Sequence, residues 1–178
     1  QVISEIQRVV NTLESGRVLR YHAAPTVAPQ TVGQHAWGVM LLVIYLTNGL
    51  ASRKLLLAAA IHDAAELITG DVPLTAKRDF PELKECLTKV EEAVHQNLVL
   101  KAYDLEPFDA AVLKLADTLE GLLWCQKTET GTMPVLGRWR KAFIAGTHKF
   151  EPIVGPDVIN RARSLFTLNQ SDLVETHQ

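Results

Sequence analysis

The stretch AAAIHDAAELITGD, residues 58–71, places a histidine and three acids within a strongly apolar run. His62 and Asp63 are neighbours, Glu66 follows three residues later, and Asp71 closes the run after a glycine. Burying an ionised carboxylate without a partner costs several kcal/mol. The run therefore needs a compensating positive charge, and a bound cation is one way to supply it.

The same stretch predicts the central helix of the fold. Ser52 is a suitable N-cap, Gly70 a suitable stop, and the residues between them are apolar nearly all round. This pattern indicates a buried helix over roughly residues 53–69. Residues i and i+4 share one face of a helix, so His62 and Glu66 are expected to lie together, with the aspartate one step around.

Helical periodicity also dominates the rest of the chain, which predicts an all-α fold of about six or seven helices. The other predicted helices span residues 2–15, 32–48, 82–102, 107–127, 135–150 and 156–168. No segment is convincing as a strand. Two loops are predicted, over residues 17–31 and over residues 71–81 (DVPLTAKRDFP). A loop as long as the first is usually functional when it is ordered. We expect one domain over residues 1–168 and a polar C-terminal tail over residues 169–178.

Composition excludes several classes of protein. The 178 residues are 47% hydrophobic with a net charge of -2, which is typical of one globular domain and not of a binder of nucleic acid polymers. The longest apolar stretch, near residues 39–46, is too short to cross a membrane. The isolated Cys86 and Cys125 favour a reducing compartment over a disulfide framework. We therefore expect a cytoplasmic protein.

Two further residues complete a candidate metal site. His35 begins a predicted helix, and Asp117 lies in the apolar helical stretch KLADTLEGL. With His62 and Asp63 they form a mixed imidazole–carboxylate set that suits zinc, and also manganese, iron, cobalt or nickel. Each residue alone is more simply a satisfied histidine or a paired acid. The ordered combination is what indicates a metal site.

The order His, His-Asp, Asp resembles the signature of the HD-domain metal-dependent phosphohydrolases. Three stretches, RYHAAPTVAPQTVGQH (20–35), HDAAELITGDVPLTAK (62–77) and KLADTLEG (114–121), are similar to those of the bacterial 5'-deoxynucleotidases of that superfamily. Small phage HD-domain triphosphohydrolases that remove dATP share these motifs, and the short segment before the third motif is more like the phage enzymes. The resemblance covers roughly residues 1–130.

The resemblance implies roles for two acids beyond the four metal ligands. Glu66 is expected to orient the attacking water or move its proton, although an acid there also suits a hydrogen bond to a ligand histidine. Asp71 is expected to protonate the leaving 5'-oxygen or steady the water. The alternative for Asp71 is a loop acid that caps a turn.

Phosphate binding requires cations. Arg20 offers a bidentate fork, and Lys77 a point charge from the loop after the second motif. Lys114 is expected to add a contact that would suit a triphosphate. Tyr21 stands where the family more often has tryptophan, and it can stack on a base or pack against a sugar. The alternative for each lysine or arginine taken alone is a solvated surface charge.

These features together predict a hydrolase of deoxyribonucleotide 5'-phosphoesters that uses a divalent zinc, cobalt or manganese ion. We expect a dNTP triphosphohydrolase, with dATP as the first candidate, in a bacterial or phage-infected host cytoplasm. The near-equal alternative is a 5'-deoxynucleotidase that acts on dNMPs. A nucleotide-sensing HD module without turnover and a purely structural helical domain are the other classes. The expected partners are a small nucleotide and further copies of the chain.

Overall fold

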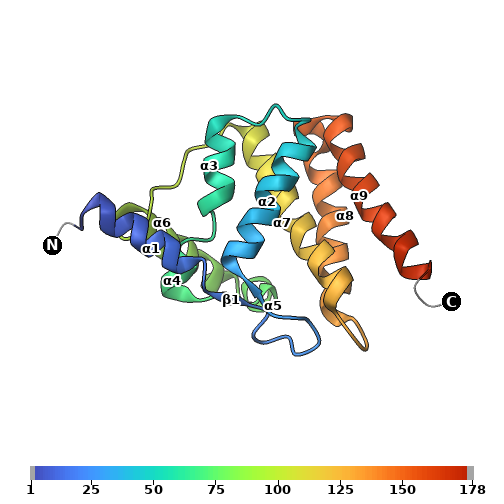
Figure 1. Cartoon of the computed structure of the whole chain (residues 1–178), viewed down its shortest axis with the longest axis horizontal. Coiled ribbons are helices and arrows are strands. Elements are labelled where there is room, and N and C mark those ends of the chain that lie inside the picture. The colour runs from blue at the N-terminus through green and yellow to red at the C-terminus, as the bar shows by residue number, and fades with distance from the viewer. Residues whose placement is uncertain (1–2, 176–178) are drawn as a thin grey trace.

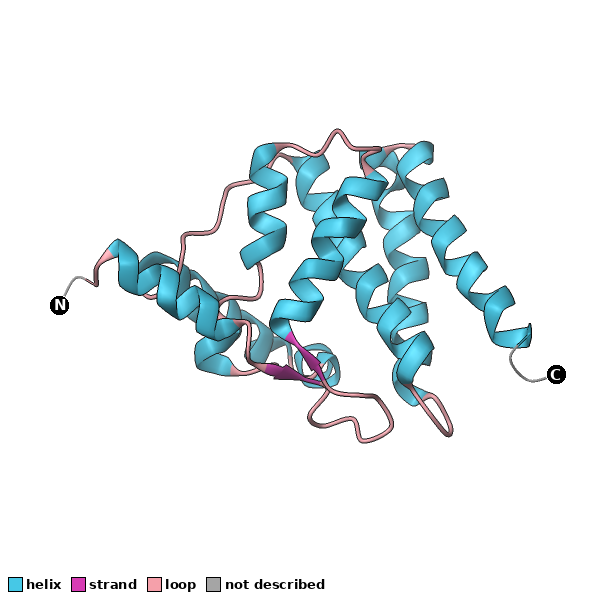
Figure 2. Cartoon of the chain, in the orientation of Figure 1, coloured by secondary structure: helices cyan, strands magenta, loops and turns pink. Residues whose placement is uncertain are grey.

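The structure, a computed structural model, describes residues 3–175, with side chains described as far as residue 167. Helices dominate this range, which confirms the predicted all-α class (Figures 1 and 2). The elements are α1 (Glu5–Ser15), β1 (Leu19–Arg20), β2 (Gln30–Thr31), α2 (Val32–Leu46), α3 (Arg53–Ile61), α4 (Glu66–Thr69), α5 (Leu74–Asp79), α6 (Pro81–Asn97), α7 (Pro107–Thr128), α8 (Pro134–Val154) and α9 (Pro156–Glu175). Within the described range, no helix is both long and apolar enough to span a bilayer.

The main core forms around α7, which packs against α2, α3, α8 and α9 (Figure 1). Leu115, Leu119 and Leu122 recur along α7 at helical spacing and are fully buried. They meet Val43 of α2 and Phe143 of α8 in one apolar cluster. Fully burying one such side chain stabilises the fold by about 1.5–3 kcal/mol, so this cluster is the main source of rigidity behind the site.

A second, smaller core joins the site to a group of short helices made of α1, α4, α5 and α6 (Figure 1). Ile61, Ala64 and Ala65 pack there against Val94 of α6 and Val99 just beyond it. The turn that carries the His-Asp pair therefore lies between two hydrophobic clusters, and both restrict its position.

The single helix predicted over residues 53–69 is wrong. Its ends are confirmed, because Ser52 caps the Leu55 amide and Gly70 adopts a φ of 65° at the stop. Between Ile61 and Glu66, however, the chain forms a tight turn with i→i+3 hydrogen bonds. His62 and Ala65 keep right-handed helical dihedrals in this turn, so the chain continues as a tighter, 3₁₀-like turn rather than as one regular helix.

Smaller differences concern the loops and helix ends. The segment DVPLTAKRDFP was expected to be a loop but contains α5, and residues 17–31 contain the antiparallel pair β1–β2. The extra short helices α4 and α5 raise the number to nine within residues 3–175, above the six or seven expected. Helix α9 continues to Glu175, so most of the predicted polar tail extends a helix; residues 176–178 lie outside the described range.

The long loop after β1 is fastened to the end of α7. The indole Nε1 of Trp124 donates to the carbonyl of Ala28 at 3.0 Å. The Thr26 hydroxyl donates to Glu129 at 3.0 Å, and the Thr130 amide donates to the Thr26 carbonyl at 2.9 Å. These bonds hold the loop against α7, beside the candidate site.

Candidate metal centre and active-site cavity

His35 is placed by a well-capped helix start. The Thr31 hydroxyl accepts from the Gln34 amide at 3.1 Å, and the Gln34 side chain accepts from the Thr31 amide at 2.9 Å. This capping box fixes the first turn of α2. His35 is the next residue, and its side chain is fully buried.

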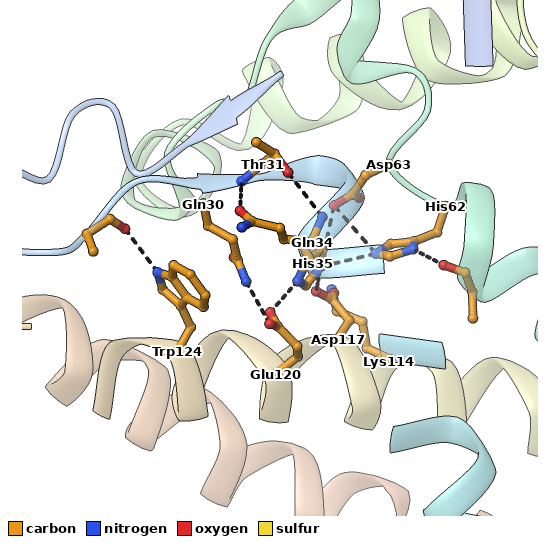
Figure 3. A network of polar contacts seen from close by, with 12 residues as sticks. Gln30, Thr31, Gln34, His35, His62, Asp63, Lys114, Asp117, Glu120 and Trp124 are labelled. Atoms are coloured by element: carbon orange, nitrogen blue, oxygen red, sulfur yellow. Dashed lines mark hydrogen bonds and ion pairs between the residues drawn. The ribbon is translucent and has the colours of Figure 1, made fainter. Parts of the chain in front are cut away.

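The four predicted metal ligands meet at one point, although they come from three parts of the chain (Figure 3). The Nε2 atom of His35 lies 3.3 Å from that of His62. It also lies 3.2 Å from Asp117 Oδ1 and 3.5 Å from Asp63 Oδ2. The Nε2 atom of His62 is 3.4 Å from the same Asp63 oxygen. The turn after α3 thus aims both members of the His-Asp pair at His35.

The hydrogen bonds made by the Nδ1 atoms of the two histidines indicate which kind of ion the cluster can bind. His62 Nδ1 lies 2.9 Å from the Ala59 carbonyl and donates to it, since that oxygen only accepts. His35 Nδ1 donates likewise to the Glu120 carboxylate. A neutral imidazole with a proton on Nδ1 has a lone pair on Nε2. Two such nitrogens and two carboxylates converge, and this donor set fits a divalent cation.

A cavity of about 610 Å³ opens beside the cluster. This volume is typical of a pocket for a small-molecule ligand. Except for the buried His35, every residue that the sequence analysis singled out for the site lines it: Arg20, Tyr21, His62, Asp63, Glu66, Asp71, Lys77, Lys114 and Asp117.

Arg20 is the most unusual of the basic residues in the cavity. Its side chain is 94% buried in the fold, with a relative exposure of 6%. Its Nη1 atom is buried and has no hydrogen-bond partner among the described residues. Strand pairing with Gln30 fixes its backbone, and its guanidinium lies 5.7 Å from the ring centre of Tyr21. A buried guanidinium with an unused donor is a preorganised site for an anion.

Lys77 and Lys114 both line the cavity, but of the two only Lys114 forms an ion pair within the described residues. Lys77 lies in the last turn of α5 and lines the cavity. Lys114 donates from Nζ to Asp117 Oδ2 at 2.6 Å, and the charge of that carboxylate raises the pKa of Lys114. Its side chain is otherwise exposed, so the pair lies at the rim of the cavity.

Glu66 is a buried acid whose Oε2 atom has no partner in the described chain. Burial, followed by the charges of Asp63 and Asp71, raises the pKa of Glu66 to about 9, while Arg20 and Lys77 oppose the shift. Asp71 Oδ2 accepts from the backbone amide of Tyr21 at 3.1 Å. Tyr21 has a φ of 63°, so this bond supports a left-handed backbone that non-glycine residues rarely adopt. Asp71 therefore shapes the loop as well as lining the cavity.

The sequence analysis missed Glu120 and Gln30, which lie behind His35. Glu120 Oε1 accepts from Gln30 Nε2 at 2.6 Å, and both side chains are buried. Burial raises the pKa of Glu120 to about 7, against the opposing effects of Arg20 and Gln30. The signal was an acid in an apolar helix three residues after Asp117, the same signal that marked Asp117 itself. Trp139 packs on the core and also lines the cavity.

The chain matches a protein family and several named proteins over much of its length. A family model described as 5'-deoxynucleotidase YfbR-like matches residues 16–132. The chain is 28% identical over 132 residues to a dATP triphosphohydrolase of Cyanophage S-2L, covering 71% of this chain and 74% of that protein. It is 30% identical over 126 residues to a dATP triphosphohydrolase of Salmonella phage PMBT28, covering 64% and 63%. It is 25% identical over 134 residues to the 5'-deoxynucleotidase VP0926 of Vibrio parahaemolyticus, covering 61% and 67%.

The fold is also similar to a solved structure. The Cyanophage S-2L HD phosphohydrolase DatZ, bound to dA and one catalytic Zn²⁺ ion, superposes with a TM-score of 0.77 at 22% identity. The match covers 97% of this chain and 99% of that one, so the likeness of fold extends over all but a few residues.

Proposed function

The chain belongs to the YfbR-like family of 5'-deoxynucleotidases, and from this premise we propose that it hydrolyses the 5'-phosphoester bond of a deoxyribonucleotide. A dNTP is the preferred substrate, with dATP first, because two relatives are dATP triphosphohydrolases. A 5'-monophosphate is the second candidate, supported by the family description and the Vibrio relative. The bond that breaks is the same in both.

The observation that carries this proposal is the buried Nη1 atom of Arg20, which has no hydrogen-bond partner in the part of the chain that the structure describes. A buried cation with an unused donor needs an anion, and a phosphate offers oxygens in the matching fork geometry. Lys77 lines the same cavity and adds a second positive charge. We place the phosphate bonded to O5' between these two residues and the metal cluster. Lys114, at the rim, then faces any phosphates farther out.

His35, His62, Asp63 and Asp117 would hold a divalent cation, zinc, cobalt or manganese, which when bound would make a water more acidic and polarise a phosphoryl oxygen. Glu66 lies one short turn from the His-Asp pair, and its free Oε2 accepts a proton from the attacking water. Burial and the charges of Asp63 and Asp71 raise the pKa of Glu66 to about 9, so the proton-accepting form requires the positive charge that a cation in the ligand set would add to Arg20 and Lys77.

Hydrolysis of the phosphorus–O5' bond needs no reactant other than water and the nucleotide. Water adds to the phosphorus that carries O5', and the phosphorus–O5' bond breaks. O5' takes a proton, for which Asp71 is the candidate donor because it lines the cavity near Tyr21. The products are the deoxynucleoside and inorganic phosphate from a monophosphate, or triphosphate from a dNTP. The Tyr21 ring stacks on the base or packs against the sugar.

Product analysis tests this proposal. The metal-free protein is incubated with Mn²⁺, Co²⁺ or Zn²⁺ and each dNTP and dNMP, and the products are separated by chromatography. Deoxynucleoside with intact triphosphate identifies a triphosphohydrolase and its base preference. Deoxynucleoside with orthophosphate from monophosphates alone identifies a 5'-deoxynucleotidase. No product in any reaction, with metal bound, contradicts the proposal and favours a nucleotide-sensing module.

We also infer that the chain forms a homo-oligomer through α2. Trp37, Leu41, Ile44 and Tyr45 line one face of this helix at helical spacing and remain exposed, at 60% for Trp37. A contiguous apolar face is typical of a surface that a second subunit covers. Leu41→Glu should lower the molar mass measured by light scattering. Phe80→Glu, at an exposed residue just after α5, is the control and should leave it unchanged.

A further inference from the structure

Glu120 lies behind the candidate metal centre and outside the cavity. It projects from α7 toward the Nδ1 side of His35, opposite the nitrogen that faces the other ligands (Figure 3). Its side chain is buried, and it is absent from the cavity lining. Glu120 therefore cannot touch a substrate in the cavity, and any effect on the reaction must pass through His35.

Both oxygens of Glu120 have assigned partners. Oε2 accepts from His35 Nδ1, and Oε1 accepts from Gln30 Nε2 at 2.6 Å. Gln30 is 1% exposed and pairs through its backbone with Arg20. The same strand pair thus fixes both the phosphate-binding arginine and the residue that orients Glu120.

The backbone of α2 leaves space for this carboxylate. Gly38 faces Glu120, and a Cβ atom at that position would lie 2.7 Å from Glu120 Cγ and 3.0 Å from Oε1. Such distances are shorter than any ordinary contact. A glycine within a helix costs stability relative to alanine, so Gly38 is best explained by the room that it gives to Glu120.

We propose that Glu120 is a positioning residue that holds His35 in the Nδ1-protonated tautomer and aims its Nε2 lone pair at the metal, with Gln30 and Gly38 fixing the carboxylate. This inference rests on the proposed metal site. A carboxylate that accepts from the outer nitrogen of a ligand histidine fixes the ring and raises its basicity. Without Glu120, the imidazole is free to place its proton on Nε2, where it blocks metal binding.

Metal affinity of the unliganded full-length protein tests this directly, without reference to turnover. We would measure the zinc Kd by competition with a fluorescent chelator for the wild type and for Glu120→Gln. Loss of an outer-shell partner typically weakens metal binding about tenfold to hundredfold, and we expect a change in that range. The activity of Glu120→Gln should recover as the metal concentration is raised, and the melting temperature of the metal-free variant separates this effect from a folding defect.

Glu129 offers a matched control. It is also a buried glutamate at the end of α7, and it accepts from the backbone amides of Val135 and Leu136. Glu129→Gln should lower the melting temperature of the metal-free protein and leave the zinc Kd unchanged. If Glu120→Gln folds poorly, Gln30→Met provides the second variant, and it should weaken zinc binding in the same direction by a smaller factor.

His35→Ala separates this inference from the proposed metal site. If His35→Ala weakens zinc binding and Glu120→Gln does not, the positioning role is wrong and the ligand set stands. If neither variant changes the Kd, the ligand set itself is wrong, and the inference falls with it. Equal loss of zinc binding in Glu129→Gln and Glu120→Gln would also overturn the positioning role, because the effect would then be general to the fold.

Discussion

The Nε2 atoms of His35 and His62 lie 3.3 Å apart, although 27 positions separate the two residues in the chain. Each ring donates from Nδ1 to another acceptor, so in the neutral imidazoles two unprotonated nitrogens face each other beside two carboxylates. Acceptors in this arrangement repel one another unless a cation lies between them. The pair of histidines is therefore the geometric reason to expect metal-dependent behaviour.

Asp63→Ala should abolish metal binding and hydrolysis together. The Asp63 carboxylate is within 3.5 Å of both Nε2 atoms, and its removal leaves the site with one carboxylate. Metal content is measured after dialysis, and activity at saturating metal. Asp79→Ala is the control, since Asp79 is exposed and pairs with Arg78. Metal binding that survives in Asp63→Ala would contradict the ligand assignment.

Glu66→Gln should keep the metal and lose about 10²–10⁴-fold in kcat, the range typical of a positioned acid–base group. The glutamine has the same shape and cannot take a proton. Because burial raises the pKa of Glu66 to about 9, its charged form is unfavourable in the fold, and the variant should melt no lower than the wild type. Metal content, kcat and melting temperature are compared on one preparation. An unchanged kcat would show that Glu66 is not catalytic.

Arg20→Ala should reduce kcat/KM by about tenfold to hundredfold, because a hydrogen bond to a charged group contributes about 1.5–3 kcal/mol. Metal affinity should change little, since no Arg20 atom is in the ligand set. Arg17→Ala is the matched control, because Arg17 is 80% exposed and pairs only with Glu14 among the described residues. Equal kinetics for the two variants would argue against phosphate binding by Arg20.

The two thiols should differ in reactivity with pH. Cys86 is exposed, whereas burial raises the pKa of Cys125 from 9.0 to about 12. At pH 8 a thiol reagent should modify one cysteine per native chain quickly, and Cys86→Ser should remove that phase. The fold favours the neutral thiol of Cys125 over its thiolate. The stability that the neutral thiol contributes is therefore complete below pH 9 and is lost as the pH rises toward 12. Fast modification of Cys125 at pH 8 would contradict this burial.

Local signals in the sequence were sufficient for the fold class, and together with the family resemblance they nominated the candidate residues of the site. Ser52 and Gly70 mark helix ends through short-range hydrogen bonding and backbone freedom, and both were correct. Acids in apolar stretches, such as Asp63 and Asp117, indicate a compensating charge because burial has a high electrostatic cost wherever the chain folds. These signals depend on neighbouring residues alone.

Tertiary structure decided the backbone conformation around those residues and the contacts that they make. The turn after Ile61 packs Ala64 and Ala65 into the smaller core, and His62 and Asp63 meet His35 from it. The partnership of Glu120 with His35 spans 85 positions, a distance over which the sequence carries no local signal. The sequence by itself supplied the candidate residues of the site, partly through acids in apolar stretches and partly through the family resemblance, but it did not supply Glu120 and Gln30. Only the fold determined their orientation, because orientation depends on contacts between distant segments.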